Sequence, residues 1–370
     1  MATITFDGIW TKYNNVAESA SDTTGTDGRI PIGTAGKGDE SHTLSATVIR
    51  DGGIYKMWYV GNGGGKYRIY YATSLNGLTW TKYNNAIPSN SDTTGTDGRI
   101  PLGTSGKADE LSADEPCVIK DGSTYKMWYN CSSTSHQQIS YATSPDGLTW
   151  TKVNNAIESA SNTTGTDGRI PLGTAGKGDD NRTVSPTVIL KDGTYHMWYS
   201  GNDGSEYRIY YASSSDGLTW TKKNNVAEAD SDTTGTDGRI PQGTGGKGDD
   251  KHVFSPTVIH NGTEFIMLYS GSDGSKFRIY SATSPDGLTW TKTNNVTPTT
   301  SDTTSSDGRI PMGTSGKGDD NYVFRPAVLL DGTTYKVWYS GNDGAAINVY
   351  YATSKGVVAG GSSSDMFLLI

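Results

Sequence analysis

The stretch YHMWYSGNDGSEYRIYYASSSDGLTWTK, from Tyr195 to Lys222, decides the fold of this 370-residue chain. It joins three short runs rich in aromatic residues through the connectors GNDGSE and SSDG. Gly and Asp tolerate the backbone angles that tight turns need, so the connectors predict turns and the runs predict strands. Apolar side chains occupy both faces of the first run, as at Met197 and Trp198, which is typical of a strand buried between stacked sheets.

This stretch and the PTVIL that precedes it recur in five copies at a period of 70 residues. One valine marks the period, at Val48, Val118, Val188, Val258 and Val328. A four-stranded unit repeated radially is a β-propeller blade, and helical periodicity is absent throughout. The sequence therefore predicts an all-β fold, a five-bladed β-propeller with a 70-residue repeat and four strands per blade.

The two ends of the chain predict how the ring closes. The motif TWTK places a tryptophan at Trp80, Trp150, Trp220 and Trp290, but the next position in the period is Gly360. The missing tryptophan appears instead as Trp10, in IWTKYNN near the N-terminus. We therefore expect the N-terminal strand to pair into the last blade as its outer strand, which removes the free edges that invite aggregation.

The period also sets the domain boundaries. We expect one propeller over residues 1–355, followed by a linker and tail over 356–370. Within the propeller, residues 1–15 hold the closing outer strand, and the blades span about 45–85, 115–155, 185–225, 255–295, and 325–355 together with 9–15. GGSSSD is typical of a flexible linker, and the short apolar end MFLLI either docks into a partner of a larger assembly or folds back onto the lower face.

Composition excludes several classes of function. The net charge is −8 and Lys and Arg form no run, which argues against nucleic-acid binding. No stretch approaches the ~20 apolar residues that span a bilayer, and MATITFDGIW has none of the features of a signal peptide. Cys117 and Cys131 lie in one repeat, where the expected strand pairing sets Cys117 opposite a residue near Trp128, so we predict no disulfide.

A long polar connector, SDTTGTDGRIP followed by a GKGDD-like segment, recurs with each blade from Ser21 onward. Because successive strands alternate in direction, we expect it to lie on the upper face beside the GNDG turn, where repeated sites would bind a repeating ligand. The candidate ligand-binding residues are Asp27, Arg29, Asp97, Arg99, Asp167, Arg169, Asp237, Arg239, Asp307, Arg309, Asn202, Asp203 and Tyr207.

Three alternatives for this connector stay open. Each Arg can instead pin the loop by pairing with the Asp residues of GKGDD, and the sameness of the copies can simply reflect late duplication. Asp22 and Asp27 offer the hard oxygen ligands that calcium prefers, although their spacing matches no standard calcium loop. Apart from calcium, no cofactor is expected.

The stretch from Tyr195 to Lys222 resembles the blade of the five-bladed propellers shared by glycoside hydrolase families 43, 32, 62, 68 and 130. The resemblance covers essentially the whole chain apart from the SDTTGTDGRIP portion and the tail. It implies carboxylates at the inner ends of the first strands around an axial funnel, with one commonly in an Asp-Pro pair, since glycosidic cleavage needs two carboxyl groups of different proton affinity.

At the positions of that pair this sequence has Ser45-Ala46, Glu115-Pro116, Ser185-Pro186, Ser255-Pro256 and Arg325-Pro326. Only one of the five is acidic, which departs from the family pattern and favours binding over hydrolysis. If the chain is an enzyme, the alternative catalytic residues are Asp114 and Glu115, with Asp39 or Asp179 as a partner. Tyr67, Tyr207 and Phe277, which follow the upper turns, offer faces on which a sugar could stack.

The leading hypothesis is a non-enzymatic, carbohydrate-binding propeller that gains avidity from repeated sites on a cell-surface polysaccharide. Display on a virion or an extracellular surface, as a phage attachment or decoration protein, suits the missing signal peptide and the apolar tail. The alternatives are a glycoside hydrolase with an axial site near blade two and a purely structural subunit of an extracellular or viral assembly.

Overall fold

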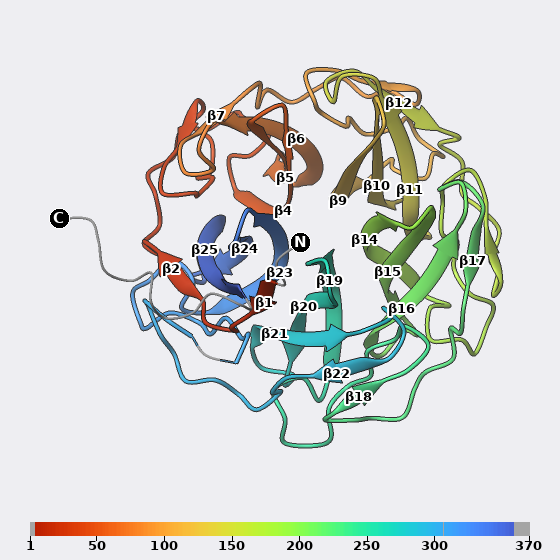
Figure 1. Ribbon diagram of the computed structural model, residues 1–370. Coiled ribbons are helices and arrows are strands. Elements are labelled where there is room, and N and C mark those ends of the chain that lie inside the picture. The colour runs from red at the N-terminus through yellow and green to blue at the C-terminus, as the bar shows by residue number, and fades with distance from the viewer. Residues whose placement is uncertain (1–3, 306, 359–370) are drawn as a thin grey trace.

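The structure is a computed structural model that describes residues 4–305 and 307–358. Those residues form strands and connecting loops with no helix, so the all-β prediction is confirmed. No helix in this part of the chain is long and apolar enough to cross a membrane. Figure 1 shows the strands grouped in sheets around a common centre.

Four groups of four antiparallel strands repeat one arrangement, and we number them units one to four. Unit one contains β4 (His42–Asp51), β5 (Ile54–Gly63), β6 (Lys66–Ser74) and β7 (Trp80–Lys82). Unit two contains β9 (Ser112–Asp121), β10 (Thr124–Ser132), β11 (Gln137–Ser144) and β12 (Trp150–Val153). Unit three contains β14 (Arg182–Lys191), β15 (Thr194–Asn202), β16 (Tyr207–Ser214) and β17 (Trp220–Lys222). Unit four contains β19 (His252–His260), β20 (Phe265–Ser272), β21 (Phe277–Ser284) and β22 (Trp290–Lys292).

Unit five combines the two ends of the chain. It contains β23 (Tyr322–Asp331), β24 (Thr334–Asn342) and β25 (Ile347–Val358), with β2 (Thr11–Tyr13) antiparallel to β25 in the register Thr11 to Thr353. The predicted pairing of the N-terminal strand with the last unit is therefore confirmed. β1 (Ile4–Phe6) adds a second pairing at the far end of β25.

The C-terminal boundary differs from the prediction. The linker was expected from residue 356, but β25 continues to Val358 because β1 pairs with it there. The predicted flexible segment and the apolar tail over 359–370 lie outside the described residues.

The first strands of the five units surround one axis. β4 packs against β9 and β23, β14 packs against β9 and β19, and β19 packs against β23. Buried tryptophans fill the space between successive units, as in the edge-to-face pair of Trp58 and Trp150, whose ring centroids are 5.8 Å apart. These tryptophans are therefore core residues.

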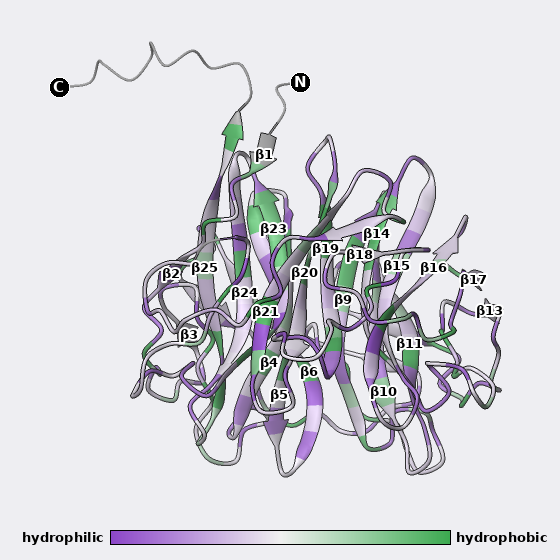
Figure 2. Ribbon diagram, turned by 90° about the horizontal axis from the view of Figure 1, so that it is seen from below, coloured by the Kyte–Doolittle hydropathy of each residue, from purple (hydrophilic) through white to green (hydrophobic). Residues whose placement is uncertain are grey.

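The prediction that the long connectors lie on the upper face holds only in part. The GKGDD-like segment of each connector ends beside the turn between the second and third strands, as where Ser41 N donates to Asn62 O, but the SDTTGTDGRIP portion runs along the flank. The first four connectors each send a two-residue strand across to the next unit, where β3 (Thr24–Gly25) pairs with β7, and in the fifth Thr304 forms an isolated bridge with Thr11. The same pairing joins β8 (Thr94–Gly95) to β12, β13 (Thr164–Gly165) to β17 and β18 (Thr234–Gly235) to β22. Figure 2 shows β3 and β13 on the flanks of the molecule. The connectors therefore cover edge strands that would otherwise be open to pairing with another chain.

After this short strand each connector turns inward between two units. Ile30, which is fully buried, forms an isolated bridge with Val349 on the third strand of the preceding unit. Ile100, Ile170, Ile240 and Ile310 repeat the bridge. The repeated connector is thus a strap that ties each unit to its neighbour, which explains its repetition without a ligand.

Candidate functional site

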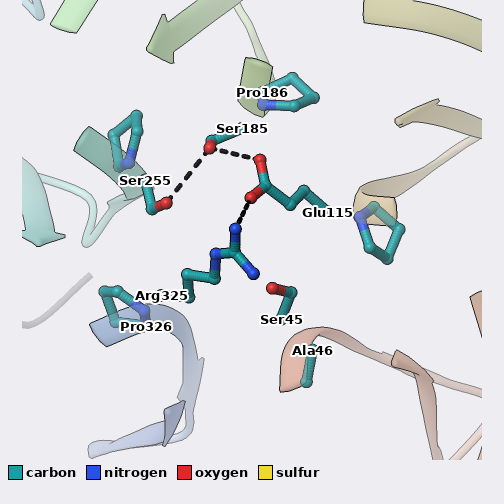
Figure 3. A pocket seen from close by; sticks show the side chains of 10 residues that line it. Ser45, Ala46, Glu115, Ser185, Pro186, Ser255, Arg325 and Pro326 are labelled. Carbon is teal, nitrogen blue, oxygen red and sulfur yellow. Dashed lines mark hydrogen bonds and ion pairs between the residues drawn. The ribbon is translucent and has the colours of Figure 1, made fainter. Parts of the chain in front are cut away.

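One residue of each first strand points toward the axis, as Figure 3 shows. These residues are Ser45, Glu115, Ser185, Ser255 and Arg325. Each has a positive φ of 48–52° and lies at an irregularity in the pairing of its strand. Left-handed backbone is rare for residues other than glycine and costs about 1–3 kcal/mol, so five strained residues at one place mark a candidate functional site.

Hydrogen bonds and one ion pair join these side chains across the axis. The carboxylate of Glu115 pairs through Oε1 with the Arg325 guanidinium and accepts a hydrogen bond through Oε2 from Ser185 Oγ, at 2.5 Å. Ser255 Oγ donates in turn to Ser185 Oγ, at 3.1 Å. The space left among them is about 40 Å³, room for little more than one water molecule. The axis is closed at this level.

Above this closure lies a cavity of about 550 Å³, a volume suited to a small ligand. It opens where the first and third strands of the units begin, and Glu115 and Arg325 form part of its floor. The wall from unit two is polar, with Ser112, Asp114, Asn130, Ser132 and Gln137.

The facing wall is aromatic and belongs to units three to five. Tyr207, Phe254, Phe277 and Phe324 follow one another with ring centroids 6.0, 5.4 and 5.9 Å apart. We call these four residues the aromatic arc. Rings with an accessible face and polar groups opposite are an arrangement that holds a sugar by stacking and hydrogen bonds.

Asp114 carries the main electrostatic feature of the cavity. Burial, followed by repulsion from Glu115, raises the pKa of Asp114 to about 6. Arg325 opposes this shift, as does a hydrogen bond from Asn130 Nδ2 to Asp114 Oδ1, at 2.5 Å. Asp114 is therefore a carboxyl group that exchanges its proton close to neutral pH, beside a Glu115 held in an ion pair.

Some of the residues singled out from the sequence line the cavity, and others lie outside it. Tyr67, Asp114, Glu115, Tyr207 and Phe277 line the cavity. Phe254 and Phe324 were missed, although the sequence held a signal for them. They occupy the repeat position of Asp114, which is leucine in the first copy and valine in the third.

The repeated arginines serve the straps. Arg29 Nη1 donates to Val16 O at 2.6 Å, and Arg29 Nη2 lies 3.2 Å from Asp27 Oδ2. The predicted pairing of these arginines with the Asp residues of GKGDD is therefore wrong, because each pairs with the Asp two residues before it. The same arrangement holds for Asp97 with Arg99, Asp167 with Arg169, Asp237 with Arg239 and Asp307 with Arg309.

Asn202 and Asp203 shape their own turn. Asn202 Oδ1 accepts from the Gly204 amide at 2.9 Å, and Asp203 pairs with Arg208 at 3.3 Å. Neither residue lines the cavity.

Asp39 and Asp179 are not catalytic partners for unit two. Asp39 is fully buried, where it pairs with Lys82 Nζ at 2.7 Å and accepts from Tyr59 and Asn85. Asp179 repeats this arrangement with Lys222 at 2.8 Å. Both carboxylates lie outside the cavity lining and serve the core of their units.

The calcium candidates have protein partners. Asp22 accepts two hydrogen bonds from Thr34 and lies 3.7 Å from Lys37, while Asp27 pairs with Arg29. Among residues 4–305 and 307–358, no three His, Cys, Asp or Glu side chains gather as a metal site. Cys117 and Cys131 are buried free thiols, so the prediction of no disulfide is confirmed.

Comparison with known proteins identifies the fold. No protein-family model matches the chain. The uncharacterized protein Rv1502 of Mycobacterium tuberculosis strain H37Rv is 31% identical over 179 residues, and MT1551 of strain CDC 1551 matches equally. The match covers 46% of this chain, and the chain spans about half the length of these relatives.

Among solved structures, a glycosyl hydrolase from Bacteroides ovatus is 15% identical with a TM-score of 0.59, and 94% of each chain is covered. A thermostable family-43 glycoside hydrolase is 16% identical with a TM-score of 0.58, covering 91% of this chain and 97% of that one. A structure from the GH130 family, which contains hydrolases that target β-1,2-mannosidic linkages in Candida mannan, is 15% identical with a TM-score of 0.58 over 94% of each chain. The chain therefore has the β-propeller fold of glycoside hydrolases, and the resemblance inferred from the sequence is confirmed.

Proposed function

We propose that the chain is a single five-bladed propeller, in which each unit is one blade and the N-terminal strand closes the ring. The pairing of β2 with β25 supports this proposal. So do Lys12 and Asn15, which reach the buried carboxylate of Asp319 at 2.8 and 2.7 Å and complete in unit five the core that Lys82 completes in unit one.

We further propose that this propeller binds a carbohydrate in the axial cavity and does not hydrolyse it. The observation that carries this proposal is the cavity itself, with the aromatic arc on one side and the polar side chains of unit two on the other. A sugar ring can stack on Phe277 while its hydroxyls meet Asp114 and Asn130. The site of binding thus differs from the strap residues that the sequence suggested.

The carboxylates of the cavity favour binding over cleavage. Glycoside hydrolysis places two carboxyl groups on opposite sides of the scissile bond, about 5–10 Å apart. The only acidic residues lining this cavity, within the described ranges, are the consecutive residues Asp114 and Glu115. Both oxygens of Glu115 are already engaged, one by Arg325 and one by Ser185.

A glycan array tests the proposal. The wild-type protein is expected to bind at least one glycan, and Phe277→Ala is expected to lose that binding because a stacking face disappears. Tyr83→Ala is the matched control, since Tyr83 is an exposed aromatic residue directly after the outer strand β7, outside the cavity. Binding that survives Phe277→Ala and falls in Tyr83→Ala would overturn the proposal.

A hydrolase remains the second candidate, because one observation favours it. Acid–base cleavage of a glycosidic bond uses two carboxyl groups, and the cavity holds Asp114, whose pKa is raised to about 6, next to Glu115. The array glycans should be incubated with the wild-type protein and with Glu115→Gln. Release of sugar by the wild type that stops in Glu115→Gln would establish hydrolysis. Display on a virion or an extracellular surface stays a prediction.

A further inference from the structure

One cation of the axial cavity has no carboxylate partner. Arg182 is the first residue of β14, is half-buried and lines the cavity. Its Nη1 donates a hydrogen bond to the hydroxyl of Tyr207 at 2.8 Å. Within the described part of the chain no Asp or Glu oxygen lies within 4.0 Å of its guanidinium, whereas Arg325 on the cavity floor pairs with Glu115.

The architecture of the repeat does not require this arginine. The equivalent positions hold His42, Ser112, His252 and Tyr322, so four of the five units build the same strand without a guanidinium there. A charge that is partly removed from water without an opposite charge costs free energy unless something else compensates it. Arg182 is therefore more easily explained by a ligand than by the fold.

Arginine offers a planar fork of donors that matches a carboxylate, with two parallel hydrogen bonds. Beside Arg182, Tyr207 begins the aromatic arc, so a sugar ring stacked on the arc can carry its acidic group toward the guanidinium. We propose that the axial cavity selects acidic oligosaccharides, and that Arg182 pairs with the carboxylate of a uronic acid residue. This inference rests on the proposed carbohydrate binding and adds the class of sugar.

The other ionisable groups of the cavity set the pH dependence. They are Asp114, Glu115, His252, Arg325 and the phenols of Tyr67 and Tyr207. Glu115 and Arg325 pair with each other, and burial lowers the pKa of His252, which disfavours its charged form. Asp114, with its pKa raised to about 6, is then the one group that repels a ligand carboxylate at pH 7 and stops doing so by pH 5. A uronate stays ionised at pH 5, so its affinity is expected to rise as the pH falls.

Isothermal titration calorimetry with matched trisaccharides tests this inference. The probes are trimers of α-1,4-galacturonate and β-1,4-glucuronate, the carboxyl-reduced neutral form of each, and a sulfated form of each neutral trimer. We expect one of the uronate trimers to bind about tenfold or more tightly than its neutral form at pH 5.5, as a charge-assisted pair allows.

Three variants assign the effect to Arg182. Arg182→Gln keeps a donor for Tyr207 but removes the charge, and it is expected to abolish the preference for the uronate. Arg182→Lys keeps the charge without the fork and should restore part of the preference. Arg50→Met is the control, because it removes an exposed arginine that pairs with Asp331 outside the cavity.

The outcomes separate this inference from the proposed function. If neutral glycans bind in a manner that depends on Phe277 and Arg182→Gln changes nothing, the acidic specificity is overturned and carbohydrate binding stands. Tighter binding of a sulfated trimer than of its uronate would overturn the choice of a carboxylate. If no glycan binds in a manner that depends on Phe277, both proposals fail.

Discussion

Single residues give the five repeats different side chains at positions where the backbone conformation is the same in every repeat. Glu115 and Arg325 share the φ of Ser45 and differ only in their side chains. One residue earlier in the repeat, Asp114 and Phe254 place a carboxyl group and a ring on opposite walls of the same cavity. The function of the site therefore depends on side chains that break the symmetry of the repeat.

The raised pKa of Asp114 predicts a cost in stability. The folded state holds the proton up to about pH 6, whereas an unfolded aspartate loses it near pH 4, so stability falls as the pH rises between these values. Asp114→Asn is expected to stabilise the protein at pH 7 by about 1 kcal/mol, since partial exposure to water reduces the full linkage. Thermal unfolding at pH 4 and pH 7 measures the difference, which should vanish at pH 4.

Glu110 supplies a control, because its pKa is shifted in the opposite direction to that of Asp114. Hydrogen bonds from the backbone amides of Gly106 and Thr134 lower the pKa of Glu110, so Glu110→Gln is not expected to stabilise the protein at pH 7. Destabilisation by Asp114→Asn at pH 7 would contradict the conclusion that burial disfavours the ionised form of Asp114.

The buried ion pairs predict a second effect of single residues on the free energy of unfolding. Lys82 and Asp39 have no exposed side-chain surface, so Lys82→Met leaves an unpaired carboxylate in the core. Removing one partner of such a pair costs about 3–5 kcal/mol, which chemical denaturation measures. Lys37→Met, which removes a partly exposed lysine 3.7 Å from Asp22, should cost less than about 1 kcal/mol. Equal losses in the two variants would contradict this account.

Sequence reasoning located some of these residues and missed the role of others. The departure of Glu115 and Asp114 from the repeat was visible because the other copies stand beside them in one chain. The pairing of Lys82 with Asp39 was not predicted, since 43 residues separate them and no local pattern joins them. The arginines were assigned to the wrong partners, although the Asp that each contacts lies only two residues before it in the sequence.

At the scale of elements, the course of the strap could not be predicted from the sequence. The strands followed from short runs rich in aromatic residues and the turns from Gly and Asp, and they occur where they were predicted. The strap has two strand residues in a long polar connector, too few for a periodic signal. Its course across the flank depends on an edge strand of the next unit, a partner that a single repeat does not reveal.

Gly25 tests the strap. A Cβ added there would lie 2.0 Å from the carbonyl oxygen of Arg29, so Gly25→Ala forces the backbone of the strap to move. We expect loss of the pairing with β7, faster hydrogen exchange at Lys82, whose amide donates to Thr23 O, and a lower melting temperature. Gly36→Ala is the control in the same connector, with φ of +86° and nothing within 4 Å, and should cost only about 1 kcal/mol. Unchanged exchange at Lys82 in Gly25→Ala would contradict the assigned role of the strap.

At the scale of the whole molecule, the pairing of β2 with β25 links the ends of the chain to the site. The axial cavity needs units three, four and five beside unit two, and unit five needs β2. The 70-residue period predicted this pairing because the missing tryptophan of the last copy was found near the N-terminus. The cavity itself was not predicted in detail, since its volume and lining depend on how the first strands meet at the axis.

A designed cross-link tests the closure. Thr11 and Thr353 are direct partners in the pairing of β2 with β25, so cysteines at both positions should form a disulfide under mild oxidation. The product is expected to unfold at a higher temperature than its reduced form. Thr11→Cys combined with Thr283→Cys, on the third strand of unit four, should not cross-link within one molecule. Equal cross-linking of the two pairs would contradict the closure.

The most direct test of the account is a crystal structure of the protein bound to a glycan selected on the array. We predict a sugar ring against Phe277 in the axial cavity, with hydroxyl groups within hydrogen-bond distance of Asp114 and Asn130. A sugar bound instead along the straps, at Arg29 and its equivalents, with the axial cavity empty, would contradict it.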